Sequence, residues 1–544
     1  MSHFGEWILP CCEQYGFLVA MASIFAFVVA FGIGANDVAN AFATSVGAKS
    51  LTLKQAICIA AVCEFLGALL LGANVAETIR KGIVDLDAFK EPDQPGALMV
   101  GMMCTLFATA IWLLTATKMG LPVSTTHSCI GGIVGFALVY KGKDAVDWGT
   151  LGKVVLSWFA SPILSAIFAV ALFLFVRTFI LRHKDSVSRA FYFYPWLIAI
   201  TVALNAYYFM YKGVKGIKSI KEFEQWKGGL VAAGIGLFLG ITLQFTLVRW
   251  WLKPAVDRKM ERKRSSEADA KADMIEAGEG APISEFAIED KKATKASVTA
   301  PAETLTGTLD KTVTNYMGDP FRKLQDENSK VAQIHAHAEV FDEKTEMIFS
   351  YLQVFTAIVD SIGHGANDVA NSIGPYAAVI GIYNSGVIDS KEEVPEWILA
   401  FGGIGITIGL ALYGYKIIES IGVELIKVTP SRGFAIELGA AIVIVFGSGM
   451  GIPLSTTHCQ VGAECGVGFL EGKGGVDKKL LGMVAAGWIL TIVIVGGISA
   501  LLFALIMYSP SEVSYEGLRT MFIENSAFNV TGTTLMPYDI VGSN

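Results

Sequence analysis

The sequence predicts an all-α polytopic membrane protein with about twelve transmembrane helices, arranged as two inverted-topology repeats that contain discontinuous helices. Three observations lead to this prediction. Hydrophobic residues make up 53% of the 544 positions and charged residues only 17%, which is more apolar than a soluble chain of this size. The apolar residues fall in blocks of about 20, enough to cross a bilayer. Two polar motifs occur twice, in the same order and at the same separation.

Each predicted span is one apolar block bounded by polar or glycine-rich residues. In chain order the blocks are 17–34, 52–73, 97–117, 122–140, 151–176, 191–211, 228–248, 348–380, 396–415, 433–449, 453–470 and 480–508. Residues 1–16 lack a basic region before the first block, so we expect that block to insert as an uncleaved anchor. The formal charge of −7 says little about such a protein, because the placement of basic residues decides its orientation.

Residues 251–345 differ in composition from the blocks around them and are rich in Lys, Glu, Ala, Ser and Thr. Their start, "VRWWLKPAVDRKMERKRSS", puts seven basic residues directly after a span, which predicts a cytoplasmic loop. Most of the loop has a composition typical of disorder. Its last third has apolar residues at helical spacing, which predicts an amphipathic helix against the bilayer or the bundle. His335 and His337 in this part are expected to be solvated.

This loop divides the chain into a first membrane repeat with linking helices (17–250) and a second membrane repeat (346–508). Seven spans before the loop and five after it place both termini, 1–16 and 509–544, outside the cell. The sequon at Asn529 agrees with that side. We expect a multi-pass protein of the plasma membrane.

The repeat is visible in two motifs. "GANDVAN" occurs at 34–40 and again at 365–371, and "GLPVSTTH" (120–127) is followed by "GIPLSTTH" (451–458). Both motifs recur at an offset of 331 residues, so the chain is a duplicated unit with an insert between its halves. The first repeat starts outside and the second inside, which is the inverted arrangement of many secondary transporters.

Four carboxylates lie in strongly apolar surroundings: Asp37, Glu64, Asp368 and Glu437. A charge in the middle of a membrane costs about 2.5–3.5 kcal/mol on insertion scales. Bound cations would remove that cost. The alternative is that the acids bond to backbone groups freed where helices break.

The two GANDVAN copies have the composition of a cation site. The glycines before each motif predict unwound backbone whose carbonyls could face an ion. Amide oxygens next to a carboxylate form a hard-oxygen set that suits Na⁺ and disfavours the softer metals bound by Cys and His. The predicted Na⁺ ligands are Asn36, Asp37, Asn40, Asn367, Asp368 and Asn371.

The two STTH copies resemble helix starts, with a proline before capping hydroxyls and free N–H groups that bind anions. The predicted tetrahedral-oxyanion site consists of Ser124, Thr125, Thr126, Ser455, Thr456 and Thr457. Alternatively, these hydroxyls satisfy only their own backbone. An anion beside the two Asp residues would be repelled unless cations intervened, so the combination implies coupled cation–anion symport. The sequence has no ATPase, kinase or redox motif, and we expect no enzymatic activity.

Histidines accompany both motifs. His127 and His458 match between the halves, so either they orient the hydroxyls or they cap the helices. His364 has no counterpart in the first half, and Asp360 lies one turn before it. A local Asp–His pair and a gating or pH-sensing role are both open.

Several stretches closely resemble the inorganic phosphate transporter (PiT) family, and in particular its eukaryotic sodium-dependent phosphate symporters. They are "GANDVANAFATSVGAKSLTLKQA", "CEFLGALLLGANVAETIRKGI", "LPVSTTHS", "SWFASPIL", "HGANDVANSIGP", "KEEVPEWILAFGG", "SRGFAIELGAA" and "IPLSTTH". The resemblance implies phosphate held near the membrane midplane together with Na⁺, and often a homodimer. It further implies that Asn36 and Asn367 contribute to phosphate binding and that Glu64, Glu437 and His364 are linked to transport.

The expected function is therefore Na⁺-driven symport of inorganic phosphate by alternating access, with Na⁺ as co-substrate and no cofactor. The expected partners are phosphate, Na⁺ and the lipid bilayer, with no role for nucleic acid. H⁺-coupled transport of phosphate or sulfate stays open, and so does a phosphate sensor built on the same fold.

Overall fold

The computed structural model describes residues 4–82, 94–212, 225–276, 321–326, 328–388, 394–449, 454–472 and 474–508. The described residues are helical with short connections, which confirms the all-α prediction. The sequon at Asn529, the middle of the predicted loop (277–320) and residues 450–453 lie outside these ranges. The division into domains therefore stays a prediction.

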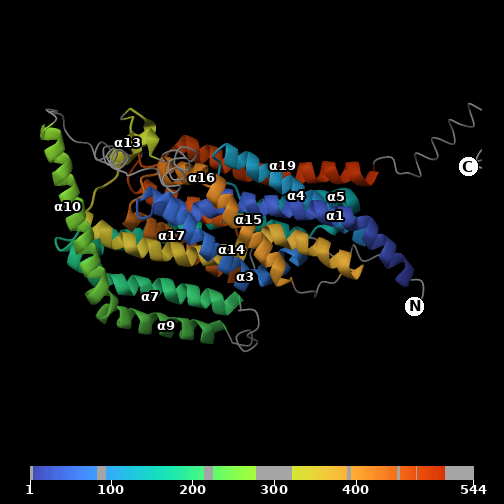
Figure 1. The fold of residues 1–544 in the computed structure, drawn as a ribbon, viewed down its shortest axis with the longest axis horizontal. Helices are drawn as coiled ribbons and strands as arrows, with labels where there is room; N and C mark the ends of the chain where they lie inside the picture. The colour runs from blue at the N-terminus through green and yellow to red at the C-terminus, as the bar shows by residue number, and fades with distance from the viewer. Residues whose placement is uncertain are drawn as a thin grey trace, which may run out of the picture.

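The described elements of the first half follow one another from α1 to α9. They are α1 (Phe4–Ile33), η1 (Gly34–Val38), α2 (Ala39–Gly47), α3 (Leu53–Gly82), α4 (Gln94–Lys118), α5 (Thr125–Lys141), η3 (Gly142–Ala145), α6 (Trp148–Val176), η4 (Arg177–Leu181), α7 (Ser186–Lys212) and α9 (Gln225–Phe245). η5 (Val248–Leu252) then leads into α10 (Lys253–Glu276), which stands across one end of the bundle (Figure 1).

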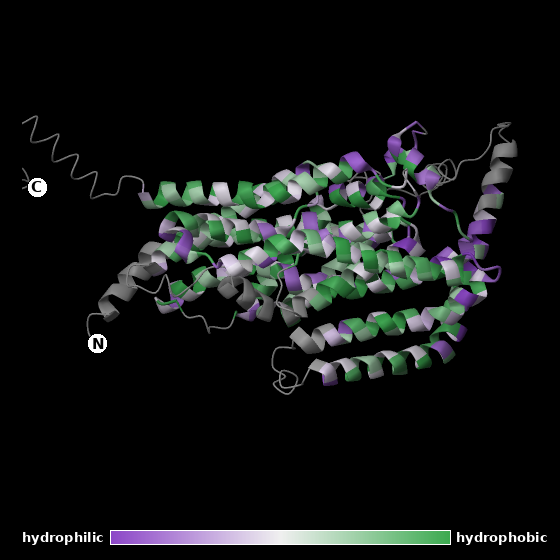
Figure 2. Cartoon of the chain, turned by 180° about the vertical axis from the view of Figure 1, so that it is seen from behind, coloured by the Kyte–Doolittle hydropathy of each residue, from purple (hydrophilic) through white to green (hydrophobic). Residues whose placement is uncertain are grey.

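The second half begins with η6 (Arg322–Leu324) and α13 (Lys330–His337). It continues with α14 (Glu343–Ser385), α15 (Glu396–Tyr413), α16 (Tyr415–Glu419), η7 (Ser420–Leu425), α17 (Pro430–Gly449), α18 (Thr456–Phe469) and α19 (Lys478–Tyr508). Figure 2 shows hydrophobic residues along the bundle and hydrophilic residues gathered at the end that carries α10 and α13. This distribution is what a membrane-embedded bundle requires.

Within the described residues, eight helices are long and apolar enough to cross a membrane, or nine if the bent pair Tyr415–Leu425 and Pro430–Phe446 counts as one span. Twelve spans therefore stay a prediction. Two of the predicted spans, 122–140 and 453–470, correspond to α5 and α18, which have 17 and 14 residues. Both are shorter than the roughly 20 residues that a bilayer crossing needs.

α4 and α5 form a hairpin, and so do α17 and α18. Thr105 of α4 packs beside Gly132 of α5, and Arg432 at the start of α17 bonds Glu471 just after α18 at 2.7 Å. The two halves of each hairpin therefore run antiparallel. The shared offset places the STT triplet at the tip of each hairpin, and both tips meet in the middle of the bundle.

The two halves pack in matching ways. α1 packs on α4 as α14 packs on α17, and α5 packs on α19 as α18 packs on α6. α1 and α14 are antiparallel, because Ser23 bonds Tyr376 at 2.9 Å while Gly16 lies beside Tyr383. Equivalent helices that run in opposite directions are what an inverted repeat predicts.

The predicted unwinding at the GANDVAN motifs is wrong. The first copy is a π-helical turn, Gly34–Val38, and the second lies inside the uninterrupted α14. The glycines serve close helix packing instead. A Cβ on Gly34 would lie 1.8 Å from the Ile406 carbonyl oxygen, and one on Gly365 would lie 2.3 Å from that of Glu64. Small residues allow membrane helices to approach this closely.

The predicted loop is also more ordered than expected at both of its ends. α10 occupies its start, in keeping with the Ala, Glu, Lys and Arg content of that stretch. Near its end, Val331 and Ile334 of α13 are buried against the bundle, as the amphipathic spacing predicts. His335 is not solvated, because its Nε2 lies 2.8 Å from the Val423 carbonyl oxygen.

After α13 the chain is held to the base of the second hairpin by a group that we call the base clamp, namely Arg182, Glu339, Arg432 and Glu471. Arg432 is 1% exposed and donates to Glu471 and to the Glu339 carbonyl oxygen at 2.7 and 2.9 Å. The Glu339 carboxylate accepts two bonds from Arg182 at 2.8 and 2.7 Å. The base clamp thus joins α14's leading segment, the second hairpin and the end of α6.

Candidate functional site

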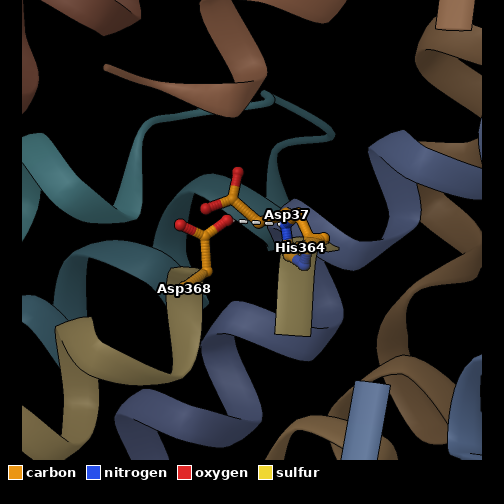
Figure 3. Close-up of side chains that lie close together, drawn as sticks. All are labelled: Asp37, His364 and Asp368. Atoms are coloured by element: carbon orange, nitrogen blue, oxygen red, sulfur yellow. Dashed lines mark ion pairs between the residues drawn. The ribbon is translucent and has the colours of Figure 1, made fainter. Parts of the chain in front are cut away.

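The centre of the candidate site lies where the GANDVAN motifs meet the two hairpin tips. Asp37 of η1 and Asp368 of α14 point toward the same space, with His364 beside them (Figure 3). One ligand atom of each of these three residues lies within 4.8 Å of the others. All three side chains are buried. The fold therefore brings together the two carboxylates that the repeat singled out.

Asp37 is held by both hairpins. Its Oδ2 accepts bonds from the Thr125 hydroxyl at 2.5 Å and the Thr125 backbone N–H at 3.3 Å. Its Oδ1 accepts a bond from the Thr457 hydroxyl. One carboxylate thus links η1 to the tips of two hairpins from opposite halves of the chain.

Asp368 repeats part of this arrangement. Its Oδ2 accepts a bond from the Thr456 hydroxyl at 3.1 Å, just as Asp37 accepts one from Thr125. Its Oδ1 accepts bonds from the amides of Asn367 and Asn371 at 3.1 and 3.3 Å. Each motif therefore binds the tip of its own hairpin, as the two-fold relation predicts.

The four predicted asparagine ligands have different surroundings. Asn371 donates to the hydroxyls of Thr125 and Thr126 at 2.9 and 3.2 Å, and its buried Oδ1 has no hydrogen-bond partner. That oxygen is available to a cation. Asn367 is half-buried and lines a cavity. The side chain of Asn40 lies outside the described part of the chain.

The Asn36 side chain holds the first hairpin in place through hydrogen bonds. Its Nδ2 donates to the Thr117 hydroxyl and to the Leu121 carbonyl oxygen, both at 3.0 Å. Its Oδ1 accepts a bond from the Val123 backbone N–H at 2.9 Å. Its assignment as a Na⁺ and phosphate ligand stays a prediction, and the observed bonds give it a structural role.

Ser124 and Ser455 act as helix caps. The Ser124 hydroxyl accepts a bond from the His127 backbone N–H at 3.1 Å, and Ser455 accepts one from His458 at 3.3 Å. The N-termini of α5 and α18 therefore both face the centre of the site. A helix N-terminus favours bound anions.

The rings of His127 and His458 do not orient those hydroxyls. They are fully buried and meet edge-to-face with 4.8 Å between ring centroids. Their ring nitrogens have no hydrogen-bond partner among the described residues. The pair packs the two hairpins together at their tips.

His364 connects Glu64 to the centre. Its Nδ1 lies 3.1 Å from Glu64 Oε2, and its Nε2 lies 2.7 Å from Asp368 Oδ2. Ser361 also donates to Glu64 at 2.8 Å. Within the described ranges His364 pairs with these two acids, and no ion pair with Asp360 is observed, so of the two open alternatives the local Asp–His pair is not found.

Glu437 lies in a separate polar group. It accepts bonds from Thr44 at 2.6 Å, Ser45 at 3.1 Å and Gln353 at 3.3 Å, and another from Thr356. Neither Glu64 nor Glu437 bonds to backbone freed at a helix break in these contacts. Side-chain hydroxyls, an amide and an imidazole hold them instead.

A cavity reaches the centre of the site between α7, α14 and the second hairpin. Its polar lining comprises Asn205, Asp360, His364, Asn367, Thr456 and Gln460. Sequence reasoning did not single out Asn205 or Gln460. A signal existed, because each is an amide inside a predicted span, but neither is repeated at the 331-residue offset.

The arrangement combines oxygen ligands for a hard cation with hydroxyls and helix N-termini for an oxyanion. Six of the eight cysteines are free, namely Cys58, Cys63, Cys104, Cys129, Cys459 and Cys465.

Comparisons with known proteins agree with this chemistry. The model of the "Phosphate transporter family" matches residues 33–499. The phosphate-repressible phosphate permease pho-4 of Neurospora crassa is 32% identical over 92% of this chain and 98% of its own length. The sodium-dependent phosphate transporter 1 of Felis catus is 29% identical over 86% of this chain and 92% of its own.

A solved structure titled "The sodium-dependent phosphate transporter" superposes on this chain with a TM-score of 0.67 and 29% identity. It covers 91% of this chain and 100% of its own. The family match spans both GANDVAN motifs, both hairpins and most of the helices around them. The chain belongs to the phosphate transporter family.

Proposed function

We propose that this transporter moves inorganic phosphate by symport with Na⁺, through alternating access around the site between the two hairpin tips. One observation carries the proposal. The hydroxyls best placed for phosphate, on Thr125, Thr456 and Thr457, now donate to Asp37 and Asp368. The same threonine hydroxyls can therefore donate either to the acids or to the anion.

This sharing gives a physical basis for coupling. Phosphate and two carboxylates repel one another in a site of low dielectric constant. Cations bound to Asp37 and Asp368 would neutralise that repulsion. They would also compete for the carboxylate lone pairs that the threonines occupy, so that hydroxyls become free to donate to phosphate. The binding order that follows is cation first and phosphate second.

Na⁺ fits the donors better than a transition metal does. The oxygens at hand come from carboxylates, hydroxyls and the unpartnered amide oxygen of Asn371. Such hard ligands suit alkali and alkaline-earth cations. The mammalian relative is named as sodium-dependent, which supports the same cation here.

H⁺ coupling is the second candidate, and the His364 contacts favour it. An imidazole between Glu64 and Asp368 forms a row of three titratable groups that ends in the site. Such a row could load and release a proton. The substrate in this case is phosphate or sulfate.

We also propose that the end bearing α10 and α13 faces the cytoplasm of a cell whose plasma membrane holds the protein. The basic residues that follow η5 support this orientation. The start of α1 and the end of α19 lie at the end of the bundle opposite α10 (Figure 1), so both termini would be extracellular. A homodimer stays a prediction.

The deciding experiment is uptake of radiolabelled phosphate into proteoliposomes under an inward Na⁺ or an inward H⁺ gradient, with sulfate as competitor. We expect the Na⁺ gradient alone to drive accumulation. Asp37→Asn and Asp368→Asn should each abolish it while leaving the protein folded. Uptake driven only by H⁺ would reject Na⁺ coupling, and normal uptake by both variants would reject the cation site.

Matched threonine variants test the phosphate half of the site. Thr457→Val removes a hydroxyl bonded to Asp37, whereas Thr109→Val removes a buried hydroxyl on α4 that has no partner. The first should raise the apparent KM for phosphate and the second should not. Equal KM values would take Thr457 out of the site.

A further inference from the structure

Glu464 of α18 is a buried acid that the two-fold site does not account for. It is 0% exposed. Its Oε1 accepts one bond, from the Gln460 amide at 3.3 Å, and its buried Oε2 has no hydrogen-bond partner. Among the described residues no basic side chain forms an ion pair with it.

An acid in this position needs compensation. Buried charges in proteins are paired or bind metal ions, and a carboxylate at mid-membrane costs about 2.5–3.5 kcal/mol on insertion scales. The nearby hairpin arginine, Arg432, is already bound to Glu471. Glu437 on the neighbouring α17 adds a second acid instead of a counter-charge, and its own oxygens are occupied by hydroxyls and an amide.

Glu464 is connected to the central cavity through Gln460. Thr457, Gln460 and Glu464 follow one another at i, i+3 and i+7 along α18, which puts them on one face of the helix. Thr457 bonds Asp37, and Gln460 lines the cavity together with His364 and Asn367. A cation in the cavity would therefore meet the Gln460 side chain before it reached Glu464.

The first half has no equivalent of this pair. At the 331-residue offset, Cys129 stands for Gln460 and Ile133 for Glu464. Cys129 and Ile133 are both buried, as the packing of an apolar helix requires. The pair is thus an addition to the second hairpin and not a copy of the duplicated site.

We propose that Gln460 and Glu464 form an accessory site for a monovalent cation, Na⁺ or H⁺, which adjoins the central site. The proposal rests on the proposed function in taking this ion to be one that the transporter couples to phosphate. The carboxylate supplies the charge, and the Gln460 amide supplies a neutral partner that can turn its oxygen toward the ion.

The surroundings offer few other groups that titrate. Glu437 faces the pair from α17, and Asp360 and His364 face the cavity from α14. α2 has no titratable side chain, and α6 has only Lys153, which is exposed. Cys465 is the neighbour of Glu464 on α18 itself. The competing interpretation is a permanently neutral Glu464 that only fills space.

The test measures ion binding by stability, without transport. Purified full-length protein in detergent is melted at increasing NaCl, with choline chloride keeping the ionic strength constant, at pH 6 and pH 8. Wild type is compared with Glu464→Gln, which keeps the shape of the side chain, and with Glu464→Ile, which installs the residue of the first half. An ion that binds only the folded state stabilises it, and the slope of stability against the logarithm of the ion concentration gives the number of ions bound.

We expect the ion dependence of stability to report one fewer bound ion in both variants than in wild type. Loss of one Na⁺ identifies Na⁺ as the occupant, and an unchanged Na⁺ dependence with one fewer proton taken up between pH 8 and pH 6 identifies H⁺. If both dependences equal those of wild type, Glu464 is a neutral core residue and the proposal is overturned. Should neither variant fold, Gln460→Met removes the other partner and is judged by the same two criteria.

The same protein separates this proposal from the proposed function. If wild type shows no Na⁺-driven phosphate uptake while Glu464→Gln still binds one ion fewer, Na⁺ symport is rejected and the accessory site is kept. If wild type takes up phosphate with Na⁺ while Glu464→Gln binds as many ions as wild type, the accessory site is rejected and Na⁺ symport is kept.

Discussion

Replacing Arg432 by methionine should strongly destabilise the protein, because it breaks a buried ion pair on one side only. Arg432 donates two bonds to Glu471, at 2.7 and 3.3 Å, and one to the Glu339 carbonyl oxygen at 2.9 Å. Its guanidinium lies over the rings of Phe173 and Phe341, 5.4 Å from each centroid. Methionine can keep the contact with both rings, so the substitution mainly removes charge and hydrogen bonds.

The magnitude follows from what is left behind. Glu471 has a side-chain exposure of 6% and would keep only the bond from the Glu339 backbone N–H at 2.8 Å. Removing one partner of a buried pair costs about 3–5 kcal/mol, because the remaining charge stays uncompensated. Adding Glu471→Gln removes that charge. The double variant should therefore be more stable than the sum of the two single effects predicts, by roughly 1–3 kcal/mol.

The assay is reversible unfolding in mixed detergent micelles of wild type, Arg432→Met, Glu471→Gln and the double variant. Phosphate uptake at equal protein amounts is measured in parallel. Effects that add within about 0.5 kcal/mol, the range seen for independent sites, would refute the pairing. A matched control is Arg182→Met, which removes an exposed partner of Glu339 from the same clamp and should change stability far less than Arg432→Met does.

Three further predictions test other parts of the structure. Gly34→Ala should prevent correct packing of η1 on α15, because its Cβ would lie 1.8 Å from the Ile406 carbonyl oxygen. The control is Gly497→Ala, which has nothing within 4 Å and should be neutral. The measurement is the yield of monodisperse protein on gel filtration. Deleting 280–315 should leave uptake intact because α10 and α13 remain, whereas deleting 321–342 should impair it by removing Glu339 from the base clamp; unchanged uptake by the second deletion would contradict the role of that segment. The hydrogen bonds from Arg182 lower the pKa of Glu339, so its contribution to stability is present above the usual pKa of a glutamate, about 4.3, and is lost as the pH falls through the lower folded value. Hydrogen exchange at 330–342 should thus rise only in acid, and no such rise would be expected in Glu339→Gln.

The repeat made the centre of the site predictable, because duplication marks which polar residues belong together. Asp37 and Asp368 could be paired with the threonines of both hairpins from the spacing of the motifs along the chain. The role of Asn36 could not, since an amide that binds an ion has the same sequence pattern as one that holds a helix end. Only the bonds to Thr117, Leu121 and Val123 show what Asn36 does.

The hairpins were missed for a related reason. An apolar block of 18 or 19 residues predicts a span, yet part of each block forms the turn and the cap, which leaves α5 and α18 too short to cross. The group around Glu437 was out of reach altogether, because Thr44 and Thr356 lie 393 and 81 residues away from it. Their meeting depends on the packing of α2, α14 and α17, which spacing along the chain does not encode.

Several departures from two-fold symmetry add polarity in the second half. Along α14, Gln353, Thr356, Asp360 and His364 lead from Asp368 toward Glu343, which pairs with α10 through Lys263 at 2.5 Å. Their counterparts along α1 are Ala22, Phe25, Val29 and Ile33, which lead from Asp37 toward the opposite end.

A polar row can solvate an ion that leaves the site, and an apolar row cannot. The duplicated motifs place like residues on both sides of the site, but the rows beside them differ. An ion that moved along α14 toward the α10 end would meet polar side chains, and one that moved along α1 would meet apolar ones.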